Sequence, residues 1–365
     1  MRYLKLSALV ISLGLFFSEA KAQKTQIDLL FIGDVMGHDA QIVSAYDSAT
    51  QIFDYNEVFA PIQHLMQAPD FTIANLEVTL AGAPYGGYPQ FSSPDELAVA
   101  LKNSGVDVLV TANNHSVDRR KQGILRTIDV LDSLEIQHTG TFKDDVDRAK
   151  NNLLLLEKND IKLGLLNYTY GTNGIPVPAP TVVNLIDTTA MKEDILLAKQ
   201  QSLDKLIVFL HWGKEYVHLP NKGQKQLAEF LFKQGADIII GSHPHVLQPM
   251  EMKETATGKQ FIAYSLGNFV SNQRTQPRDG GAMVKLSLTK ENGKTEIANH
   301  GYYLTWVNKT FLPKRAKFEI LSAAEVETNE YKGLSDFSRN KMKSFVDSSR
   351  VLFQKHNIGV EEIKN

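Results

Sequence analysis

The sequence predicts an α/β fold in which a largely buried β-sheet is flanked by helices. Short apolar runs such as residues 27–32 are typical of buried strands. They alternate with amphipathic segments such as residues 122–134, whose apolar positions recur with the period of a helix. This alternation is typical of α/β proteins, and the sequence shows no internal repeat or low-complexity tract that would indicate another architecture.

The individual elements follow from local signals in chain order. Further strands are predicted at 71–74, 106–111, 153–156, 162–166, 206–210, 238–240 and 261–264. Further helices are predicted at 57–66, 94–103, 190–199 and 224–234. Pro94 suits the first turn of a helix, and Gly235 suits a helix C-terminus. Residues 282–288 and 295–305 alternate apolar and polar side chains around a turn, which predicts an antiparallel pair and hence a second sheet or a mixed edge.

Composition limits the classes of protein that the chain could be. It has 365 residues, enough for one large domain or two ordinary ones, and 43% of them are hydrophobic. Lys and Arg number 39 against 41 Asp and Glu, so the basic excess of a general nucleic-acid binder is missing and no nucleic-acid partner is expected. The absence of cysteine excludes disulfides, thiolate zinc sites, iron–sulfur clusters and a cysteine nucleophile.

Residues 1–22 are predicted to be a secretory signal peptide. A basic start and an apolar run over residues 6–17 precede Ala20-Lys21-Ala22, which matches an A-x-A cleavage pattern. The alternative is an uncleaved anchor, but the apolar run is shorter than the ~20 residues that a spanning helix needs. We therefore expect an exported protein, periplasmic or extracellular, with no stable membrane span after cleavage.

Polar side chains with metal-binding chemistry follow many of the predicted strands. Because binding sites in open α/β sheets form beyond the carboxyl ends of the strands, we expect these side chains to converge. Their carboxylate, amide and imidazole groups form a mixed oxygen and nitrogen set that suits Mn²⁺, Fe or Zn²⁺, singly or as a pair. The strand-end residues are Asp34, His38, Asn75, Glu77, Asn113, Asn114, His115, Asp118, His211, His243 and His245.

Each of these residues also has a structural interpretation when it is taken alone. Asp34 could form a turn or cap a helix, Glu77 could be a surface carboxylate, and His211 could be a core imidazole. Asn113 and Asn114 could form a turn, because Asn tolerates left-handed geometry. The His243-Pro244-His245 turn is more specific, since two imidazoles one residue apart have few structural uses. The coincidence of ligand types at several strand ends favours one shared site.

Six motifs then occur in a specific order and spacing. They are GDVMGH (33–38), ANLEVTL (74–80), TANNHSVD (111–118), LHWGKEY (210–216), GSHPHVLQPME (241–251) and YSLGNFV (264–270). Together they resemble the CapA family, which is named for poly-γ-glutamate capsule synthesis and is related to calcineurin-like metallophosphatases. The resemblance covers about residues 26–310, and residues 321–365 fall outside it as a predicted helical C-terminal extension.

The resemblance implies a metallophosphatase-like αββα sandwich, with two packed β-sheets flanked by helices and two divalent metal ions (Mn, Fe or Zn) at the strand ends. The implied metal ligands are Asp34, Glu77, Asn114, His211, His243 and His245. His115 would be the catalytic histidine that protonates the leaving oxygen, and Asp118 would orient it. The implied reaction is hydrolysis of a phosphoester or a related bond by metal-activated water.

Two positions depart from the phosphatase pattern. Met36 stands at the third position of the usual D-x-H motif, and His38 lies too far along the chain to replace that histidine. Glu77 stands where phosphatases have a bridging aspartate and is one methylene longer. These departures bear on activity more than on fold, so a non-catalytic accessory or binding protein in capsule, poly-γ-glutamate or cell-envelope polymer biosynthesis is the alternative. A third hypothesis is a metal-dependent amidase acting on γ-glutamyl or cell-wall peptide bonds.

The substrate is expected to be an anionic small molecule or polymer. Ser265 and Asn268 follow a predicted strand and could form a substrate rim, although a tight turn would explain them equally. Arg274 and Arg278 lie in a Gly/Pro-containing stretch and could reach an anion, although an ordinary surface role is the alternative. The partner that the resemblance implies is the machinery of a cell-envelope polymer.

Overall fold

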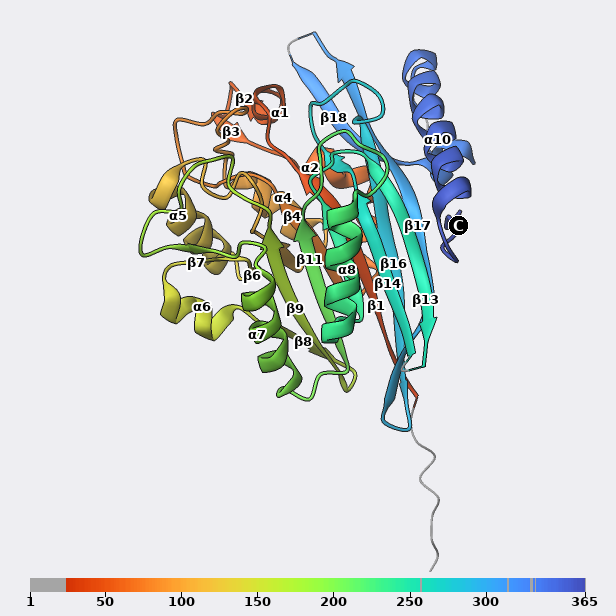
Figure 1. Ribbon diagram of the computed structural model, residues 1–365. Helices are drawn as coiled ribbons and strands as arrows, with labels where there is room; N and C mark the ends of the chain where they lie inside the picture. Colours follow the sequence, from red (N-terminus) through yellow and green to blue (C-terminus); the bar gives the residue numbers. More distant parts are fainter. Residues whose placement is uncertain (1–23, 257, 314, 329–330, 332, 365) are drawn as a thin grey trace, which may run out of the picture.

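Two β-sheets pack face to face and helices cover them on the outside, as the computed structural model shows (Figure 1). The structure describes residues 24–256, 258–313, 315–328, 331 and 333–364. The predicted signal peptide at 1–22 therefore lies outside the described residues. The predicted α/β sandwich with two packed sheets is confirmed.

The first sheet is built around β1 (Thr25–Val35) and is half parallel and half antiparallel. On one side of β1 lie the parallel strands β4 (Phe71–Leu76), β5 (Val108–Val110) and β6 (Gln137–Thr139). On the other side lie the antiparallel strands β16 (Gly280–Glu291), β17 (Lys294–Phe311) and β18 (Ala316–Ser322). The short strand β15 (Asn268–Val270) pairs with the end of β1. The predicted antiparallel pair corresponds to β16 and β17. With β18, which ends at Ser322, they form the antiparallel edge of this mixed sheet.

The second sheet has six strands in the order β13-β14-β12-β11-β9-β8. They are β8 (Leu154–Lys158), β9 (Ile161–Thr169), β11 (Lys205–His211), β12 (Ile238–Ser242), β13 (Leu247–Thr255) and β14 (Gly258–Leu266). Its inner face packs against the inner face of the first sheet through fully buried side chains such as Leu29, Phe31, Ile207 and Phe209. Two further pairs of short strands, β2 (Tyr46–Asp47) with β3 (Ile52–Phe53) and β7 (Thr141–Phe142) with β10 (Val182–Val183), stabilise the loops.

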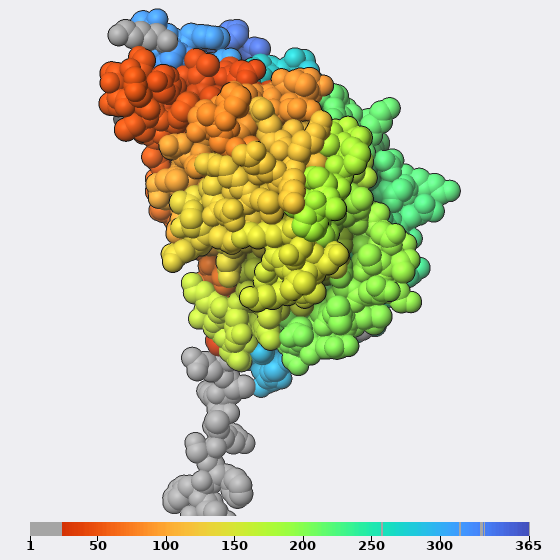
Figure 2. Space-filling model, turned by 90° about the vertical axis from the view of Figure 1, so that its left-hand side faces the viewer, coloured from red at the N-terminus to blue at the C-terminus, as the bar shows by residue number. Residues whose placement is uncertain are grey.

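Helices cover the outer faces of both sheets. The first sheet is covered by α1 (Asp39–Ala45), α2 (Asn56–Phe59), η1 (Ala60–Ile62), α3 (Gln63–Gln67) and α4 (Glu96–Asn103). Beside β6 and β7 lie α5 (Arg120–Ser133) and α6 (Asp145–Asn151), whose yellow atoms cover much of the face in Figure 2. The second sheet is covered by α7 (Thr188–Lys199) and α8 (Lys222–Gln234). None of the helices in the described ranges combines the length and the hydropathy needed to cross a bilayer.

Local chemistry explains where these helices begin and end. The helical segment predicted at 57–66 is confirmed, but it is divided into three short segments around Pro61, whose ring lacks the N–H that a continuous helix needs. The prediction for Gly235 is confirmed, since it ends α8 with a left-handed φ of 115°. At the other end of α8, the Asn221 side chain accepts a hydrogen bond from the backbone N–H of Gln224.

The C-terminal segment is docked on the sandwich. After the short helix α9 (Ala323–Glu327), the long helix α10 (Asp336–His356) packs against β13 and β17 along an edge of the sandwich (Figure 1). Its buried side chains Met342, Phe345, Val346 and Phe353 belong to the same core as the two inner sheet faces. The helix therefore completes the core, a point that the sequence had left open.

We expect Phe345→Ala to lower the free energy of unfolding by about 3–5 kcal/mol, the usual cost of emptying a buried aromatic site. The Phe345 side chain is fully buried, and its ring lies close against Gly280 of β16. Urea titration followed by tryptophan fluorescence measures the change. Phe337→Ala on the same helix is the matched control, since that ring is 72% exposed, and its effect should stay within about 0.5 kcal/mol. Equal losses in both variants would contradict the docking of α10.

Candidate metal centre

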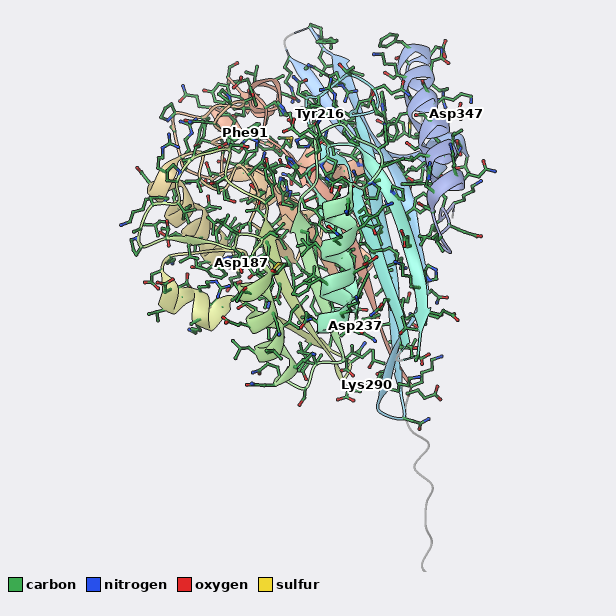
Figure 3. All side chains as sticks on the ribbon, viewed as in Figure 1. Phe91, Asp187, Tyr216, Asp237, Lys290 and Asp347 are labelled. Carbon is green, nitrogen blue, oxygen red and sulfur yellow. The ribbon has the colours of Figure 1, made fainter. Side chains whose placement is uncertain are left out.

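The candidate site lies at the carboxyl ends of the parallel strands in both sheets. In Figure 3, Phe91 and Tyr216 mark this end of the molecule, and Asp237 and Lys290 mark the opposite end. Two groups of potential ligand atoms lie there, and within each group the atoms are within 4.8 Å of one another. One group is Glu77, His211 and His243, and the other is Asp34, Glu77 and His245. Asn114 joins them, because its Oδ1 atom lies 2.9 Å from Nε2 of His211. The structure thus brings all six predicted ligands together.

Unusual backbone geometry aims several of these side chains. Gly33 permits the close approach of β1 to the loop after β14, because a Cβ atom there would lie 2.2 Å from the carbonyl oxygen of Gly267. His243 and His245 both adopt left-handed conformations, with φ values of 97° and 55°. Non-glycine residues hold such conformations at a cost in free energy, and they occur preferentially at functional sites. The turn around Pro244 therefore directs two imidazoles into one cluster.

Glu77 is the residue that the two groups share. Its side chain is fully buried, and neither of its carboxylate oxygens has a hydrogen-bond partner among the described residues. The Oε1 atom lies 3.5 Å from Nε2 of His211 and 3.7 Å from Nε2 of His245. Burial, reinforced by the charge of Asp34, raises the pKa of Glu77 well above its usual range. A buried carboxylate without donors fits a site that supplies a cation, so these residues fit a metal centre.

Two histidines of the cluster, His211 and His243, are in the form that binds metals. Burial and the neighbouring imidazoles lower the pKa of His211, and burial lowers the pKa of His243 to about 3. Both rings are therefore neutral at pH 7, as a ligating imidazole must be. His211 turns Nε2 toward the cluster because Nδ1 is paired with Ser242 Oγ at 2.9 Å. His245 has Nδ1 at 3.0 Å from Asn268 Oδ1.

His115 and Asp118 form the pair that the sequence predicted. Nδ1 of His115 lies 2.7 Å from Oδ2 of Asp118, and both side chains are buried. Asp118 is itself held, because the backbone N–H of Phe91 donates to the same oxygen at 2.7 Å. The Phe91 ring packs edge-on against the His115 ring with 4.6 Å between ring centroids. This arrangement fixes the tautomer of His115 and leaves Nε2 as its other functional nitrogen.

The three predicted substrate-binding residues make different contacts. Ser265 donates from Oγ to the carbonyl oxygen of Val246 at 2.8 Å, which stabilises the turn after the histidines. Asn268 is fully buried and contacts His245, so it positions a candidate ligand. Arg274 donates to the carbonyl oxygen of Val307 and lies over the ring of Trp306, and none of its contacts is with the cluster. Direct substrate binding by these three residues stays a prediction.

Two residues that shape the site had only a general expectation from the sequence, Asn75 as a strand-end residue and Tyr170 as a residue that could line the pocket or pack in the core. Asn75 is fully buried, donates from Nδ2 to Asp34 Oδ1 at 2.9 Å, and thereby orients a candidate ligand. Its position two residues before Glu77, at the end of β4, was the available signal. Tyr170, which is 46% exposed, lies with its ring 4.5 Å from that of His243 and forms part of the rim. Aromatic residues of this kind carry no sequence signal that separates rim from core.

His38 lies beside the cluster and not within it. Its backbone begins α1, and its Nδ1 atom lies 3.2 Å from Gln41 Oε1 and accepts from the backbone N–H of Asn272 at 3.3 Å. Its ring packs edge-on against Phe91. Burial lowers the pKa of His38 to about 4, so the ring is neutral at pH 7. Met36, at the position where phosphatases have a ligand, is buried.

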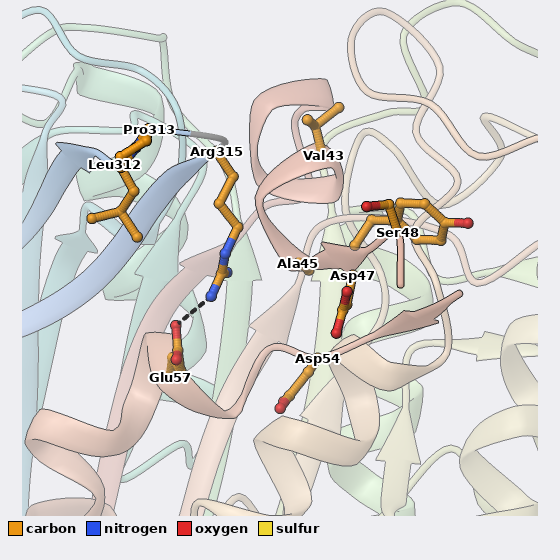
Figure 4. A pocket seen from close by; sticks show the side chains of 10 residues that line it. Val43, Ala45, Asp47, Ser48, Asp54, Glu57, Leu312, Pro313 and Arg315 are labelled. Atoms are coloured by element: carbon orange, nitrogen blue, oxygen red, sulfur yellow. Dashed lines mark hydrogen bonds and ion pairs between the residues drawn. The ribbon is translucent and has the colours of Figure 1, made fainter. Parts of the chain in front are cut away.

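A separate pocket near the start of the chain has no part in this cluster. It has a volume of about 720 Å³ and is lined by α1, the β2–β3 hairpin and the connection from β17 to β18 (Figure 4). Arg315 crosses it and donates to Glu57 Oε2 at 3.0 Å and to the carbonyl oxygen of Ser44 at 2.7 Å. These contacts hold the connection against α1 and α2, and no residue of the cluster lines the pocket.

The two packed sheets flanked by helices have a metallophosphatase-like fold, and the ligand cluster lies at their strand ends. Among solved structures, a putative 5′-nucleotidase from Staphylococcus aureus is similar to this chain with a TM-score of 0.50 and 13% sequence identity. That alignment covers 88% of this chain and 58% of the other. At this identity the similarity concerns the fold alone, and it agrees with the fold that the motifs predicted.

The chain belongs to the bacterial capsule synthesis protein PGA_cap family, whose model matches residues 28–273. It is 31% identical over 279 residues to the PGA biosynthesis protein CapA of Bacillus subtilis, covering 73% of this chain and 69% of that protein. It is 28% identical over 290 residues to the capsule biosynthesis protein CapA of Bacillus anthracis, covering 74% of this chain and 66% of that protein. The chain thus matches about two-thirds of the length of these relatives.

We expect Glu77→Gln to abolish tight binding of at least one divalent ion. The substitution removes the charge that both ligand groups share while keeping nearly the same shape. Elemental analysis after dialysis against Mn²⁺ or Zn²⁺ measures the metal content, and a thermal shift measures the stabilisation by metal. Glu229→Gln, on the exposed face of α8, is the control and should leave both readouts at the wild-type level. Wild-type metal content in Glu77→Gln would exclude Glu77 as a shared ligand.

We expect His38 to make the protein less stable in mild acid. Its folded-state pKa of about 4 is below the ordinary 6.5, so the unfolded chain takes up a proton first as pH falls. The stabilisation is therefore complete above about pH 6.5 and is lost as pH falls toward 4, with a slope of up to about 1.4 kcal/mol per pH unit.

His38→Asn removes this titration and still provides a residue that can begin a helix. The free energy of unfolding should therefore decrease less from pH 7.5 to pH 5 in the variant than in the wild type. An identical pH dependence in the two proteins would show that His38 is not the group responsible.

Proposed function

We propose that the protein is an exported, metal-dependent hydrolase that acts on a phosphoester or a related bond in the biosynthesis of a cell-envelope polymer. The observation that carries the proposal is Glu77, a buried carboxylate shared by two ligand groups and lacking a hydrogen-bond donor among the described residues. The His115–Asp118 pair beside these groups adds a proton donor of fixed orientation. The signal peptide predicted at residues 1–22 supports a periplasmic or extracellular location.

The ligand groups suit two divalent ions, and the mixed oxygen and nitrogen donors suit Mn, Fe or Zn. Asp34, Glu77 and His245 would hold one ion, and Glu77, His211 and His243, with Asn114 beside them, would hold the other. Such ions lower the pKa of a bound water and stabilise the charge that develops on the substrate. Asn75, Ser242 and Asn268 hold Asp34, His211 and His245 in place.

His115 has the geometry of a general acid. Asp118 accepts a hydrogen bond from Nδ1–H, which leaves Nε2 to carry or deliver a proton. The buried carboxylate stabilises the protonated ring during the reaction, and the Phe91 ring restricts its rotation. In this role His115 would donate a proton to the leaving oxygen of an ester, or to the leaving nitrogen if the substrate is a γ-glutamyl amide.

A non-catalytic role in poly-γ-glutamate or capsule biosynthesis is the second candidate function. It is supported by the names of the two CapA relatives and by Met36, which stands where phosphatases have an additional histidine ligand. In that role the cluster would bind an anionic polymer or a partner of the envelope machinery without turnover. The His115–Asp118 pair favours the hydrolase, because a binding site does not need an oriented proton donor.

We expect His115→Ala to lower kcat about 10²- to 10⁴-fold while the metal content stays unchanged. Steady-state hydrolysis of p-nitrophenyl phosphate and bis(p-nitrophenyl) phosphate, by protein loaded with Mn²⁺ or Zn²⁺, tests this effect. His64→Ala is the control, because that side chain is 61% exposed and lies on α3. If the wild-type protein hydrolyses neither ester nor a γ-glutamyl amide but retains poly-γ-glutamate, the accessory role replaces the hydrolase.

A further inference from the structure

We propose that Arg278 binds an anionic oxyacid group of the substrate, a carboxylate or a phosphate, at the rim of the metal cluster. This inference rests on the proposed function and deepens it. It says that the substrate carries an anionic group next to the group on which the metal cluster acts. Four observations support it: the position of the arginine, its backbone anchor, its unpaired charge and the support of its loop by α10.

Arg278 lies next to the candidate ligands through Tyr216. The guanidinium carbon is 4.5 Å from the centroid of the Tyr216 ring, a distance typical of cation–π contacts. The centroid of the Tyr216 ring is 6.1 Å from that of the His245 ring. The backbone N–H of Tyr216 donates to the carbonyl oxygen of Pro244 at 2.8 Å. Because Tyr216 is 45% exposed, the stack stands at the border between the buried cluster and solvent.

The backbone of Arg278 is anchored to a residue that contacts a candidate ligand. Its carbonyl oxygen accepts from Asn268 Nδ2 at 2.8 Å, and Oδ1 of the same Asn268 lies 3.0 Å from His245 Nδ1. Its N–H donates to the carbonyl oxygen of Thr275 at 2.9 Å, which closes a turn. The base of this side chain is therefore held at a fixed place relative to the cluster.

The charge of Arg278 has no carboxylate partner within the described ranges of the chain. Several other partly buried arginines do have one: Arg126 pairs with Asp95, Arg148 with Asp194, and Arg350 with Glu327 and Glu362. Arg274 on the same loop has no carboxylate partner either, and its Nη1 atom is buried without a hydrogen-bond partner among the described residues, but its guanidinium donates to the carbonyl oxygen of Val307 and lies over Trp306 and not over Tyr216. Arg278 also forms a side-chain hydrogen bond with Tyr216. A guanidinium has five N–H donors, so others remain available for two-point binding of a carboxylate or phosphate.

The loop that carries Arg278 is fastened to α10. The amide of Gln276 donates to the carbonyl oxygen of Ser344 at 2.9 Å and to Ser348 Oγ at 3.1 Å, and it accepts from Ser344 Oγ at 2.9 Å. The family match ends at residue 273, so both Arg278 and its support lie beyond the matched segment. Arg278 thus lies outside the segment that the family model matches, whereas the rim residues Tyr170 and Tyr216 lie within it.

Binding measured without turnover tests the proposal on the metal-loaded protein. The probes are inorganic phosphate, a γ-linked glutamate oligomer, and the methyl ester of that oligomer as an uncharged control. We expect Arg278→Ala to weaken binding of at least one anionic probe about 10- to 100-fold by calorimetry, and Arg278→Lys to weaken it less. Lys225→Ala on the exposed side of α8 removes the same charge elsewhere and should leave the affinity unchanged. Metal content should be equal in all four proteins.

The results separate this inference from the proposed function. Loss of affinity in Arg278→Ala supports the inference even if no probe ester is hydrolysed, and in that case the accessory role is favoured. Turnover with unchanged KM and unchanged anion affinity in Arg278→Ala overturns the inference and leaves the hydrolase in place. Equal affinity of the wild type for the oligomer and its methyl ester, together with no binding of phosphate, also overturns it. The anionic probe that loses affinity distinguishes a carboxylate from a phosphate ligand.

Discussion

The buried carboxylate of Glu77 is the constraint on which the site depends. It is fully enclosed, it has Asp34 nearby, and within the described residues it has no hydrogen-bond donor. An arrangement of this kind is unfavourable in a protein interior unless protons or cations compensate it. His211 and His243, which their lowered pKa values keep neutral at pH 7, can share a cation with it, so the burial that is unfavourable for the carboxylate also favours metal binding.

The architecture makes this cluster possible because the six candidate ligands come from the ends of five strands, with His243 and His245 both following β12. Parallel pairing aligns β1 with β4 in one sheet and β11 with β12 in the other, and the two sheets meet face to face. Side chains far apart in the sequence are therefore delivered to one place by rigid elements whose own core does not depend on the site. Surrounding amides and hydroxyls then set the orientation of each ligand, with Asn75, Ser242 and Asn268 in contact with three different ones.

The rim of the site is built from less regular structure than its centre. Tyr170, Tyr216 and Arg278 come from loops, and the loop of Arg278 relies on α10 for support. Loops tolerate variation more readily than the strands that carry the ligands. A centre carried by rigid strand ends and a rim built from loops would let the rim change without displacing the candidate ligands.

The sequence by itself determined the class of fold and the set of candidate ligands. Buried strands and amphipathic helices have strong local periodicity, and Asp34, Glu77 and the His243-Pro244-His245 turn stand directly at strand ends. It did not determine which neighbouring groups would contact these ligands. Asn268 was expected at a substrate rim and is a buried support for His245, while Arg274 and Arg278 carried the same expectation although only Arg278 stacks on Tyr216 at the rim.

Tertiary structure decided these points because they depend on contacts between segments distant in the sequence. Two arginines four residues apart have the same local chemistry, and only the packing of Trp306 near one and Tyr216 near the other separates their roles. The docking of α10 was likewise invisible locally, since an amphipathic helix shows that it has a face to bury but not the surface that receives it. Local sequence thus fixed the elements and their chemistry, and the packing of the two sheets fixed which chemical groups meet.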